Sequence, residues 1–278
     1  MTTSHHATLA RLERYYDAVL RPVARTEDVG PLTLFVREGA GPPLFARPTL
    51  GHAGRVAAHD VARARERQRE LGVPEHFEWV AETAPTLRAA MERDGLAVRE
   101  HPLLVLEPGA LLPVVRHRPD GVTVRMVAPA DPALPSALTV PHLAFAEPGT
   151  RVGATGLVEL AAALPRHGTP SAVRAVAEGI RAGRTAVAAA VDDASGLALC
   201  AAQRHLAGDS SEIVGVGTLP AARRRGLALA VTAALAADAR TRGVRTVFLA
   251  AEDPDVARLY GQIGFVRAGT AMLAGPAT

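Results

Sequence analysis

The chain has 278 residues, of which 48% are hydrophobic, and its formal net charge is +3. This composition is too apolar for a disordered chain and predicts a folded, soluble protein of one large domain or two smaller ones. No apolar run reaches the roughly 18 residues of a membrane span. The first residues, Met1 to His6, lack the basic start and apolar core of a signal peptide, so we expect a cytoplasmic location and no membrane partner.

Two compositional features limit the chemistry of the chain. All 31 basic residues are arginine, so no lysine can act as a nucleophile or form a Schiff base. The single cysteine, Cys200, lies in an apolar run and is expected to be a buried small residue rather than a redox or zinc-binding one. His52 and His59 have no further ligands beside them, so no metal site is expected.

The first half of the chain alternates strand and helix patterns, and Trp79 is expected to lie in its core. A long charged helix carries Arg63, Arg65, Arg67 and Arg69 beside Glu66 and Glu70, which indicates a solvated, ion-paired face rather than a nucleic-acid-binding one. The predicted elements are helices at 9–20, 56–71 and 85–93 and strands at 32–36, 43–46, 77–80 and 102–106.

The second half reads as an α+β sheet domain, with three strands in an antiparallel meander. Thr169 is a possible helix cap. The predicted elements are strands at 122–127, 185–191, 197–205, 211–218, 246–250 and 264–273, and helices at 132–146, 168–179, 226–241 and 254–262.

The two halves share an order of elements, which indicates a diverged internal duplication. A stretch rich in proline and glycine, from Glu107 to Gly121, is a plausible boundary between them. We therefore predict two domains, residues 1–118 and residues 119–278.

A turn rich in arginine and glycine joins the strand ending at Thr218 to an alanine-rich helix. Gly226 can let the backbone approach a ligand, and the first N–H groups of the helix have no partners inside it. The helix dipole and three arginines, Arg223, Arg224 and Arg225, add positive charge. This turn is therefore predicted to bind an anion such as a pyrophosphate.

The same turn, Arg223-x-x-Gly226-x-Ala228, resembles the acyl-CoA-binding motif of the GNAT N-acyltransferase superfamily. Further along, a tyrosine, Tyr260, precedes the pair Gly264-Phe265, which is similar to the second signature of that superfamily. The resemblance covers residues from about 122 to 273, and the first half resembles a GNAT-like unit that has lost cofactor binding. It implies an α+β fold of tandem GNAT-like domains, with a mixed, mostly antiparallel sheet flanked by helices.

The resemblance also implies roles for individual residues. Tyr260 would donate a proton to the departing CoA sulfur, with an unperturbed pKa near 10. Asp253 takes the place of a family asparagine that contacts the cofactor, and a carboxylate cannot donate a hydrogen bond as that amide does. The pantetheine arm would pair with a strand backbone and the pyrophosphate would lie in the turn, which together use Val216, Gly217, Thr218, Arg223, Arg224, Arg225, Gly226, Leu227 and Ala228.

A base must remove a proton from an ammonium acceptor, and Glu212, at the start of the strand before the motif, is the first candidate. A solvated strand-end glutamate is the alternative interpretation. His142, Glu147 and His205 are weaker candidates and are more typical of surface or packing residues.

The predicted function is an acetyl-CoA-dependent N-acetyltransferase without a metal, acting on an amine, as a monomer or homodimer. A non-catalytic acyl-CoA-binding regulatory or partner-binding protein is the main alternative. Nucleic-acid binding through the arginines is a second one, which a steep dependence on salt would reveal.

Overall fold

The computed structural model describes residues 3–39, 41–52, 54–110, 112 and 120–277. These residues form two compact units, which are considered separately. Unit 1 comprises the described residues of Met1–Val105, Ala250–Arg258 and Val266–Thr278, and unit 2 comprises those of Leu106–Leu249 and Leu259–Phe265. The predicted boundary at residues 118 and 119 lies outside the described residues and stays a prediction.

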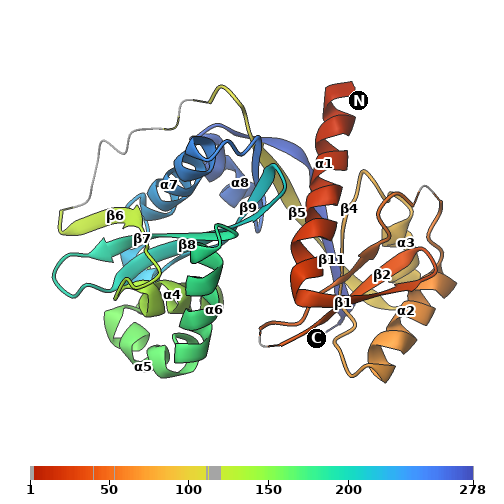
Figure 1. Ribbon diagram of the computed structural model, residues 1–278, viewed down its shortest axis with the longest axis horizontal. Coiled ribbons are helices and arrows are strands. Elements are labelled where there is room, and N and C mark those ends of the chain that lie inside the picture. Colours follow the sequence, from red (N-terminus) through yellow and green to blue (C-terminus); the bar gives the residue numbers. More distant parts are fainter. Residues whose placement is uncertain (1–2, 40, 53, 111, 113–119, 278) are drawn as a thin grey trace. The chain divides into compact units, whose positions relative to one another are not determined.

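Unit 1 is built on a sheet with the strand order β1-β2-β3-β4-β11-β5 (Figure 1). The pairs β1–β2, β2–β3 and β4–β11 are antiparallel, whereas β3 and β4 are parallel and share a single residue pair, Ala46 with Phe77. Its elements are α1 (Thr3–Leu20), η1 (Arg21–Val23), β1 (Ala24–Val29), β2 (Leu32–Arg37), β3 (Ala46–Pro48), α2 (Ala58–Glu70), β4 (Phe77–Val80), α3 (Leu87–Arg93), β5 (Leu96–Leu106) and β11 (Phe265–Pro276).

The core of unit 1 lies between this sheet and helices α2 and α3. Trp79 is 1% exposed within it, as the sequence predicted. Met272 and Ala274 of β11 belong to the same cluster. The last strand of the chain, which the sequence analysis placed with the second domain, therefore packs into the core of unit 1.

Unit 2 has the strand order β10-β9-β8-β7-β6, antiparallel except for the parallel pair β9–β10. Helices α4, α5 and α6 cover one face of this sheet and α7 covers the other (Figure 1). Its elements are β6 (Val122–Met126), α4 (Leu134–Ala146), α5 (Leu157–His167), α6 (Pro170–Arg181), β7 (Thr185–Asp192), β8 (Ala198–Ala207), β9 (Ser210–Thr218), η2 (Pro220–Ala222), α7 (Leu227–Thr241) and β10 (Thr246–Ala250), followed by α8 (Pro254–Gly261), which contributes to both units.

The predicted meander and most helices are present, and the predicted α+β class is confirmed. Thr169 caps α6 by accepting a hydrogen bond from the Ala172 N–H at 3.3 Å. Helix α5 and strand β1 were not predicted. Helix α5 carries Pro165 in its last turn, a residue that interrupts the usual helical pattern.

Helix α4 packs closely on strand β9, and Gly217 makes this contact possible. A Cβ atom at Gly217 would lie 2.7 Å from Pro141 Cα and 3.1 Å from Ala144 Cβ. Such distances are below van der Waals contact, so any side chain here would push the helix away from the strand.

Candidate functional site

The turn that opens helix α7 contains two residues with left-handed backbone geometry, separated by Arg225. Gly226, the residue before the helix, has φ 73°, and Arg224 has φ 65°. Among the described residues, Arg224 is the only non-glycine with positive φ. Left-handed residues in a turn direct successive N–H groups into one concavity, which is a common anion-binding arrangement.

Among the described residues, the N–H groups of this turn have no acceptors at ordinary hydrogen-bond geometry. In the part of the chain that the structure describes, no backbone N–H from Arg224 to Leu229 donates a hydrogen bond, and the first donor of the helix is Ala230, which bonds to Gly226 O at 3.1 Å. The first turn of α7 contains no acidic residue. The site therefore offers unpaired N–H groups and the positive end of a helix dipole to an anion.

The three arginines of the turn have different surroundings. The Arg223 guanidinium donates to three carbonyl oxygens, those of Ala144 at 3.0 Å, Glu147 at 2.5 Å and Arg151 at 3.1 Å. It therefore caps the C-terminal end of α4, and the predicted part of Arg223 in binding a pyrophosphate stays a prediction.

Arg224 is exposed, and no hydrogen bond or ion pair of its side chain is formed with another described residue. Arg225 is also exposed and lies near Asp192, whose pKa is held below its ordinary value by hydrogen bonds from Ser195 and, to a smaller extent, by Arg225. Of the three, Arg224 is the guanidinium most available to an anion.

Strands β9 and β10 separate just before this turn. Their pairing is limited to Ser210–Glu212 with Thr246–Phe248, and β9 continues alone on that side to Thr218. A bulge with Gly215 at φ 62° marks the separation.

The backbone beyond the bulge has a defined direction. The Leu219 N–H bonds to Leu199 O at 2.8 Å, toward β8, and Gly217 pairs with Ala201 of the same strand. Because N–H and C=O directions alternate along a strand, those of Val216 and Thr218 point away from β8, into the opening beside β10.

Tyr260 lies on α8 and is 5% exposed, with its ring at 61° to the ring of Phe265. Burial raises the pKa of its phenol, and Cys200 adds to the effect, so the expected unperturbed pKa is wrong. Thr232 of α7 opposes this rise in the pKa, yet its Oγ1 forms no hydrogen bond of ordinary geometry within the described residues.

Cys200 is fully buried, as expected for a structural residue. Burial raises the pKa of its thiol to about 12, so it remains a neutral thiol. It accepts a hydrogen bond from the Thr218 hydroxyl at 3.2 Å.

Glu212 lies on β9 between two neighbours, His205 of β8 and Phe248 of β10. Its side chain is half-buried and has partners, so it is not simply a solvated strand end. His205 Nδ1 lies 3.3 Å from the Thr185 hydroxyl, and burial lowers the pKa of this histidine.

The other candidates on the predicted acceptor side, His142 and Glu147, interact with neighbouring residues of the fold. His142 stacks on His167 at 4.1 Å between ring centroids, and burial together with the charge of His167 lowers the pKa of His142. Glu147 accepts a hydrogen bond from the Thr155 hydroxyl at 3.0 Å. Both residues lie in the segment from α4 to α5, which bonds to the loop before the turn through Gly153 N–H to Pro220 O at 3.1 Å.

Asp253 begins helix α8. Its Oδ1 accepts a hydrogen bond from the Val256 N–H at 2.8 Å, and the following residue is Pro254. Aspartate and asparagine cap helices equally well. The exchange of one for the other therefore preserves the local structure of this loop.

In unit 1, helix α2 also follows a strand and a glycine-containing loop, yet its first turn holds an acid. Asp60 accepts a hydrogen bond from the Ala57 N–H at 3.0 Å, which uses an N–H of the helix start and places negative charge there. An anion is repelled from such a site. This was not recognised from the sequence, although an acid at the third helical position is a capping signal.

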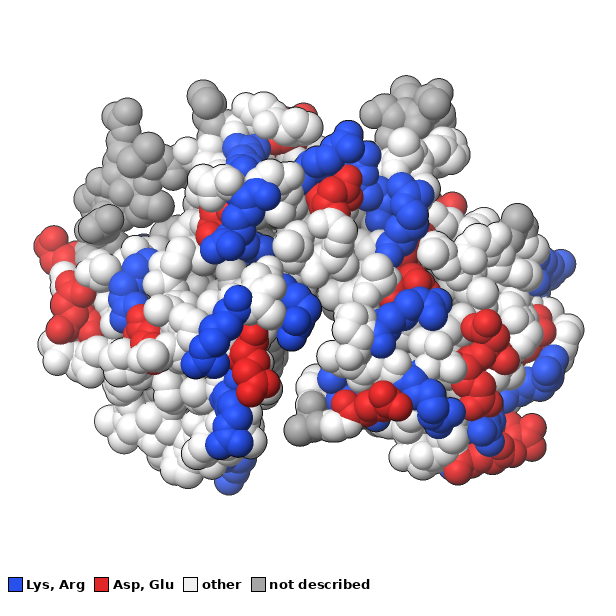
Figure 2. Space-filling model, viewed as in Figure 1, with Lys and Arg blue, Asp and Glu red and all other residues white. Residues whose placement is uncertain are grey.

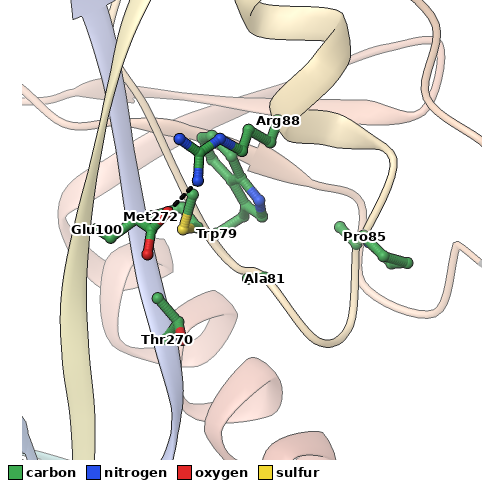
Figure 3. Close-up of a pocket in the computed structure, with 8 residues that line it drawn as sticks. Trp79, Ala81, Pro85, Arg88, Glu100, Thr270 and Met272 are labelled. Carbon is green, nitrogen blue, oxygen red and sulfur yellow. Dashed lines mark hydrogen bonds and ion pairs between the residues drawn. The ribbon is translucent and has the colours of Figure 1, made fainter.

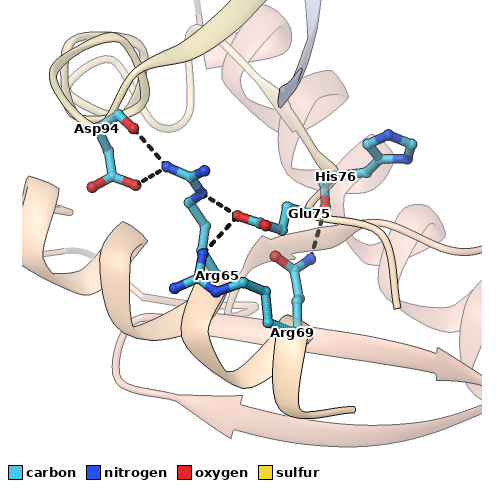
Figure 4. A network of polar contacts seen from close by, with 6 residues as sticks. Arg65, Arg69, Glu75, His76 and Asp94 are labelled. Carbon is cyan, nitrogen blue, oxygen red and sulfur yellow. Dashed lines mark hydrogen bonds and ion pairs between the residues drawn. The ribbon is translucent and has the colours of Figure 1, made fainter. Parts of the chain in front are cut away.

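Three of the four arginines of α2 form ion pairs, in part with acids outside the helix. Arg65 bonds to Glu75 at 2.5 Å and to Asp94 at 2.6 Å, and Arg69 bonds to Glu75 at 3.0 Å (Figure 4). Arg67 pairs with Glu27 and Glu70. Where α2 and α3 lie, on the right of Figure 2, arginines alternate with acidic residues. This mixed charge does not resemble the basic patch of a nucleic-acid-binding surface.

A cavity of about 250 Å³ opens in unit 1 and contains none of the predicted site residues (Figure 3). The Arg88–Glu100 ion pair lies at this cavity, and the Nε1 atom of Trp79 is buried without a partner among the described residues. The lining residues are Trp79, Ala81, Ala84, Pro85, Arg88, Glu100, Thr270 and Met272.

Two features that the described residues lack bear on the class of site. No group of three or more histidine, cysteine, aspartate or glutamate side chains is arranged to hold a metal ion. None of the helices in the described residues is long and apolar enough to cross a membrane.

Comparison with known proteins identifies the fold. Residues 193–272 match the family of FR47-like proteins. The chain is similar to a GCN5-related N-acetyltransferase from Kribbella flavida, with a TM-score of 0.68 and 22% identity over 97% of this chain and 96% of that one. A GCN5-related N-acetyltransferase from Sphaerobacter thermophilus gives a TM-score of 0.58 and 19% identity over 91% and 84% of the two chains.

A tandem GNAT protein from the clavulanic acid biosynthesis pathway gives a TM-score of 0.53 and 16% identity, over 89% of this chain and 79% of that one. None of the curated proteins matches significantly. The predicted resemblance to the GNAT superfamily, with its tandem arrangement, is confirmed.

Proposed function

Because the chain has the GNAT fold, we propose that it is an acetyl-CoA-dependent N-acetyltransferase that acts on an amine, most simply a small molecule. The observation that carries this proposal is the turn from Arg224 to Gly226, whose unpaired N–H groups open helix α7 beside the separated strands β9 and β10. An anion site next to an unpaired strand edge suits a ligand that has a pyrophosphate and an amide-containing arm.

The residues fit that ligand in two ways. The N–H groups of the turn, together with the exposed Arg224 side chain, would bind the pyrophosphate oxygens. The outward-facing backbone groups of Val216 and Thr218 would pair with the amides of the pantetheine arm, as an added strand would. Acetyl-CoA supplies the activated acyl group when bound.

Proton transfers balance the reaction. The neutral amine nitrogen forms a bond to the acyl carbon, the C–S bond breaks, and its electron pair goes to sulfur. Tyr260 gives its phenolic proton to that sulfur and regains one from solvent, whereas the proton lost by the acceptor nitrogen goes to Glu212 or to water. Positioning of the two reactants accounts for most of the acceleration.

Unit 1 is proposed to have lost this donor site. Asp60 occupies the N-terminal turn of α2, where a pyrophosphate would otherwise meet free N–H groups. Unit 1 would then have a structural role or contribute to binding of the acceptor.

Replacement of Arg224 by alanine tests the proposal. We expect acetyl-CoA to bind the wild type saturably in a calorimetric titration, and the variant to bind about tenfold more weakly through loss of one charge-assisted contact. Thermal stability should be unchanged, because the Arg224 side chain is exposed and forms no hydrogen bond or ion pair with a described residue.

The matched control is Arg223→Ala. This change removes three hydrogen bonds to the end of α4, so we expect a lower melting temperature and a smaller effect on affinity. Absence of saturable binding to the wild type, or equal affinity of wild type and Arg224→Ala, would contradict the proposed site.

Substitution of Tyr260 by phenylalanine tests the acid. Because burial raises its pKa, the phenol stays protonated above its ordinary range, and wild-type kcat should show no decline from Tyr260 ionisation up to about pH 10. We expect Tyr260→Phe to lower kcat by about 10- to 100-fold with little change in KM for acetyl-CoA, measured by CoA release. Full kcat in this variant across that pH range excludes the acid role, whereas saturable acetyl-CoA binding by the wild type without CoA release on any amine favours the alternative of a non-catalytic acyl-CoA-binding protein.

A further inference from the structure

Exposed apolar side chains gather in one segment of unit 2. Of the six exposed large apolar side chains in the described residues, three lie between residues 145 and 158. Phe145, at the end of α4, is 56% exposed, and Val152, between α4 and α5, is 61% exposed. Single exposed apolar residues are common, whereas a group of them at one place marks a binding surface.

One guanidinium brings the backbones of Phe145 and Val152 together. The Arg223 side chain donates to the carbonyl oxygens of Ala144 and Arg151, at 3.0 Å and 3.1 Å. These are the residues directly before Phe145 and Val152, so both exposed side chains start from backbone beside the same planar group. We call Phe145 and Val152 the apolar wall.

The apolar wall is fixed to the turn from Arg224 to Gly226. The Gly153 N–H donates to Pro220 O at 3.1 Å, and the Ala221 N–H donates to Thr155 O at 3.0 Å. Both partners on the far side of these bonds belong to η2, the short helix that leads into the turn. The segment from α4 to α5 is therefore held next to the proposed donor site.

Helix α4 places Phe145 along the opening that begins at the bulge of β9. A Cβ atom at Gly217 would lie 2.7 Å from Pro141 Cα, and one at Gly215 would lie 3.9 Å from the Pro141 ring, so this part of α4 packs on β9. Phe145 follows Pro141 by one helical turn and lies on nearly the same side of α4. The apolar wall therefore borders the opening in which an acceptor amine would meet the acyl group.

The charges of the segment indicate which end of an acceptor the wall would bind. Its acids have partners: Glu147 accepts a hydrogen bond from the Thr155 hydroxyl at 3.0 Å, and Glu159 accepts one from the Gly156 N–H at 2.7 Å. Arg151 is exposed, and its side chain forms no hydrogen bond or ion pair with another described residue. A positive charge here repels an ammonium group, so the wall suits the uncharged end of an acceptor.

We propose that the apolar wall binds the body of the acceptor, and that the acceptor is a primary amine carrying an aromatic or long aliphatic group. Binding removes the apolar surfaces of Phe145, Val152 and the acceptor from water, which is favourable in proportion to the area covered. The amine end then remains at the opening beside β9. The inference rests on the proposed acetyltransferase function and names its substrate class.

Two matched amines test the substrate class. Phenethylamine and ethanolamine share an aminoethyl chain and differ in a phenyl group against a hydroxyl group. With acetyl-CoA at saturation and CoA release as the measurement, we expect the wild-type kcat/KM to be about tenfold or more higher for phenethylamine. An equal or higher kcat/KM for ethanolamine would overturn the inference and leave the acetyltransferase function in place.

The variant Phe145→Ser tests the wall itself. Because this side chain is largely exposed, the melting temperature should be unchanged. We expect KM for phenethylamine to rise about tenfold, with KM for acetyl-CoA and kcat/KM for ethanolamine unchanged, and Phe145→Leu to keep the low KM. The matched control is Leu50→Ser, at an exposed leucine of unit 1, which should alter none of these values. A higher KM for acetyl-CoA in Phe145→Ser would mean that Phe145 contacts the donor, which overturns the inference.

A binding measurement separates the inference from the proposed function. Saturation-transfer NMR detects phenethylamine on the protein in the presence of CoA, without turnover. We expect a signal for the wild type that Phe145→Ser removes and Leu50→Ser keeps. If acetyl-CoA binds but no amine releases CoA, the acetyltransferase function is refuted, and this pattern of NMR signals would still support the wall as the site of an apolar amine. Absence of the wild-type signal, or an equal signal in Phe145→Ser, would overturn the inference.

Discussion

Replacement of Gly226 by valine is expected to reduce the affinity for acetyl-CoA on the order of 100-fold, about 2.7 kcal/mol. Gly226 has φ 73°, a conformation that a β-branched residue strongly disfavours. The turn would therefore relax, and the N–H groups that it directs outward would no longer converge on one anion. Calorimetric titration with acetyl-CoA measures the effect.

Gly243, at the other end of helix α7, provides a matched control. It has φ 75°, and a Cβ atom at either glycine would meet nothing within 4 Å. Valine at Gly243 should therefore strain the backbone and lower thermal stability to a similar extent, while leaving acetyl-CoA affinity unchanged. Equal losses of affinity in the two variants would mean that stability, rather than the turn, determines binding.

The sequence was sufficient to predict the turn because all of its determinants are local. A glycine, a preceding strand and an alanine-rich helix lie next to one another in the chain, and each predicts the same backbone geometry. The contacts of the Arg223 side chain could not be predicted, because its three acceptors lie on the segment from Ala144 to Arg151, far away in sequence. A side chain that caps a remote helix end leaves no local pattern.

The surroundings of Tyr260 could not be predicted for the same reason. Its phenol is buried, and its pKa is raised by this burial, which only the folded chain produces. The packing of β11 into unit 1 is also non-local, because it depends on pairing with β4, which lies in the first third of the sequence.

Substitution of Asp238 by alanine is expected to destabilise the protein by about 3–5 kcal/mol. Asp238 of α7 accepts two hydrogen bonds from Arg204 of β8, at 3.0 Å from Nε and 2.5 Å from Nη2, and Arg204 is only 1% exposed. Removal of the carboxylate leaves a buried guanidinium without its counter-charge. Urea-induced unfolding monitored by circular dichroism measures the loss.

Asp255→Ala is the control for Asp238→Ala. Asp255 forms an ion pair with Arg258 at 2.6 Å, but both side chains are about three-quarters exposed, so its loss should amount to less than about 1 kcal/mol. The double variant Arg204→Met/Asp238→Leu should recover much of the lost stability, because no unpaired charge is then buried. Equal losses of stability in Asp238→Ala and Asp255→Ala would mean that water reaches Arg204 and that the Arg204–Asp238 ion pair does not hold α7 to the sheet.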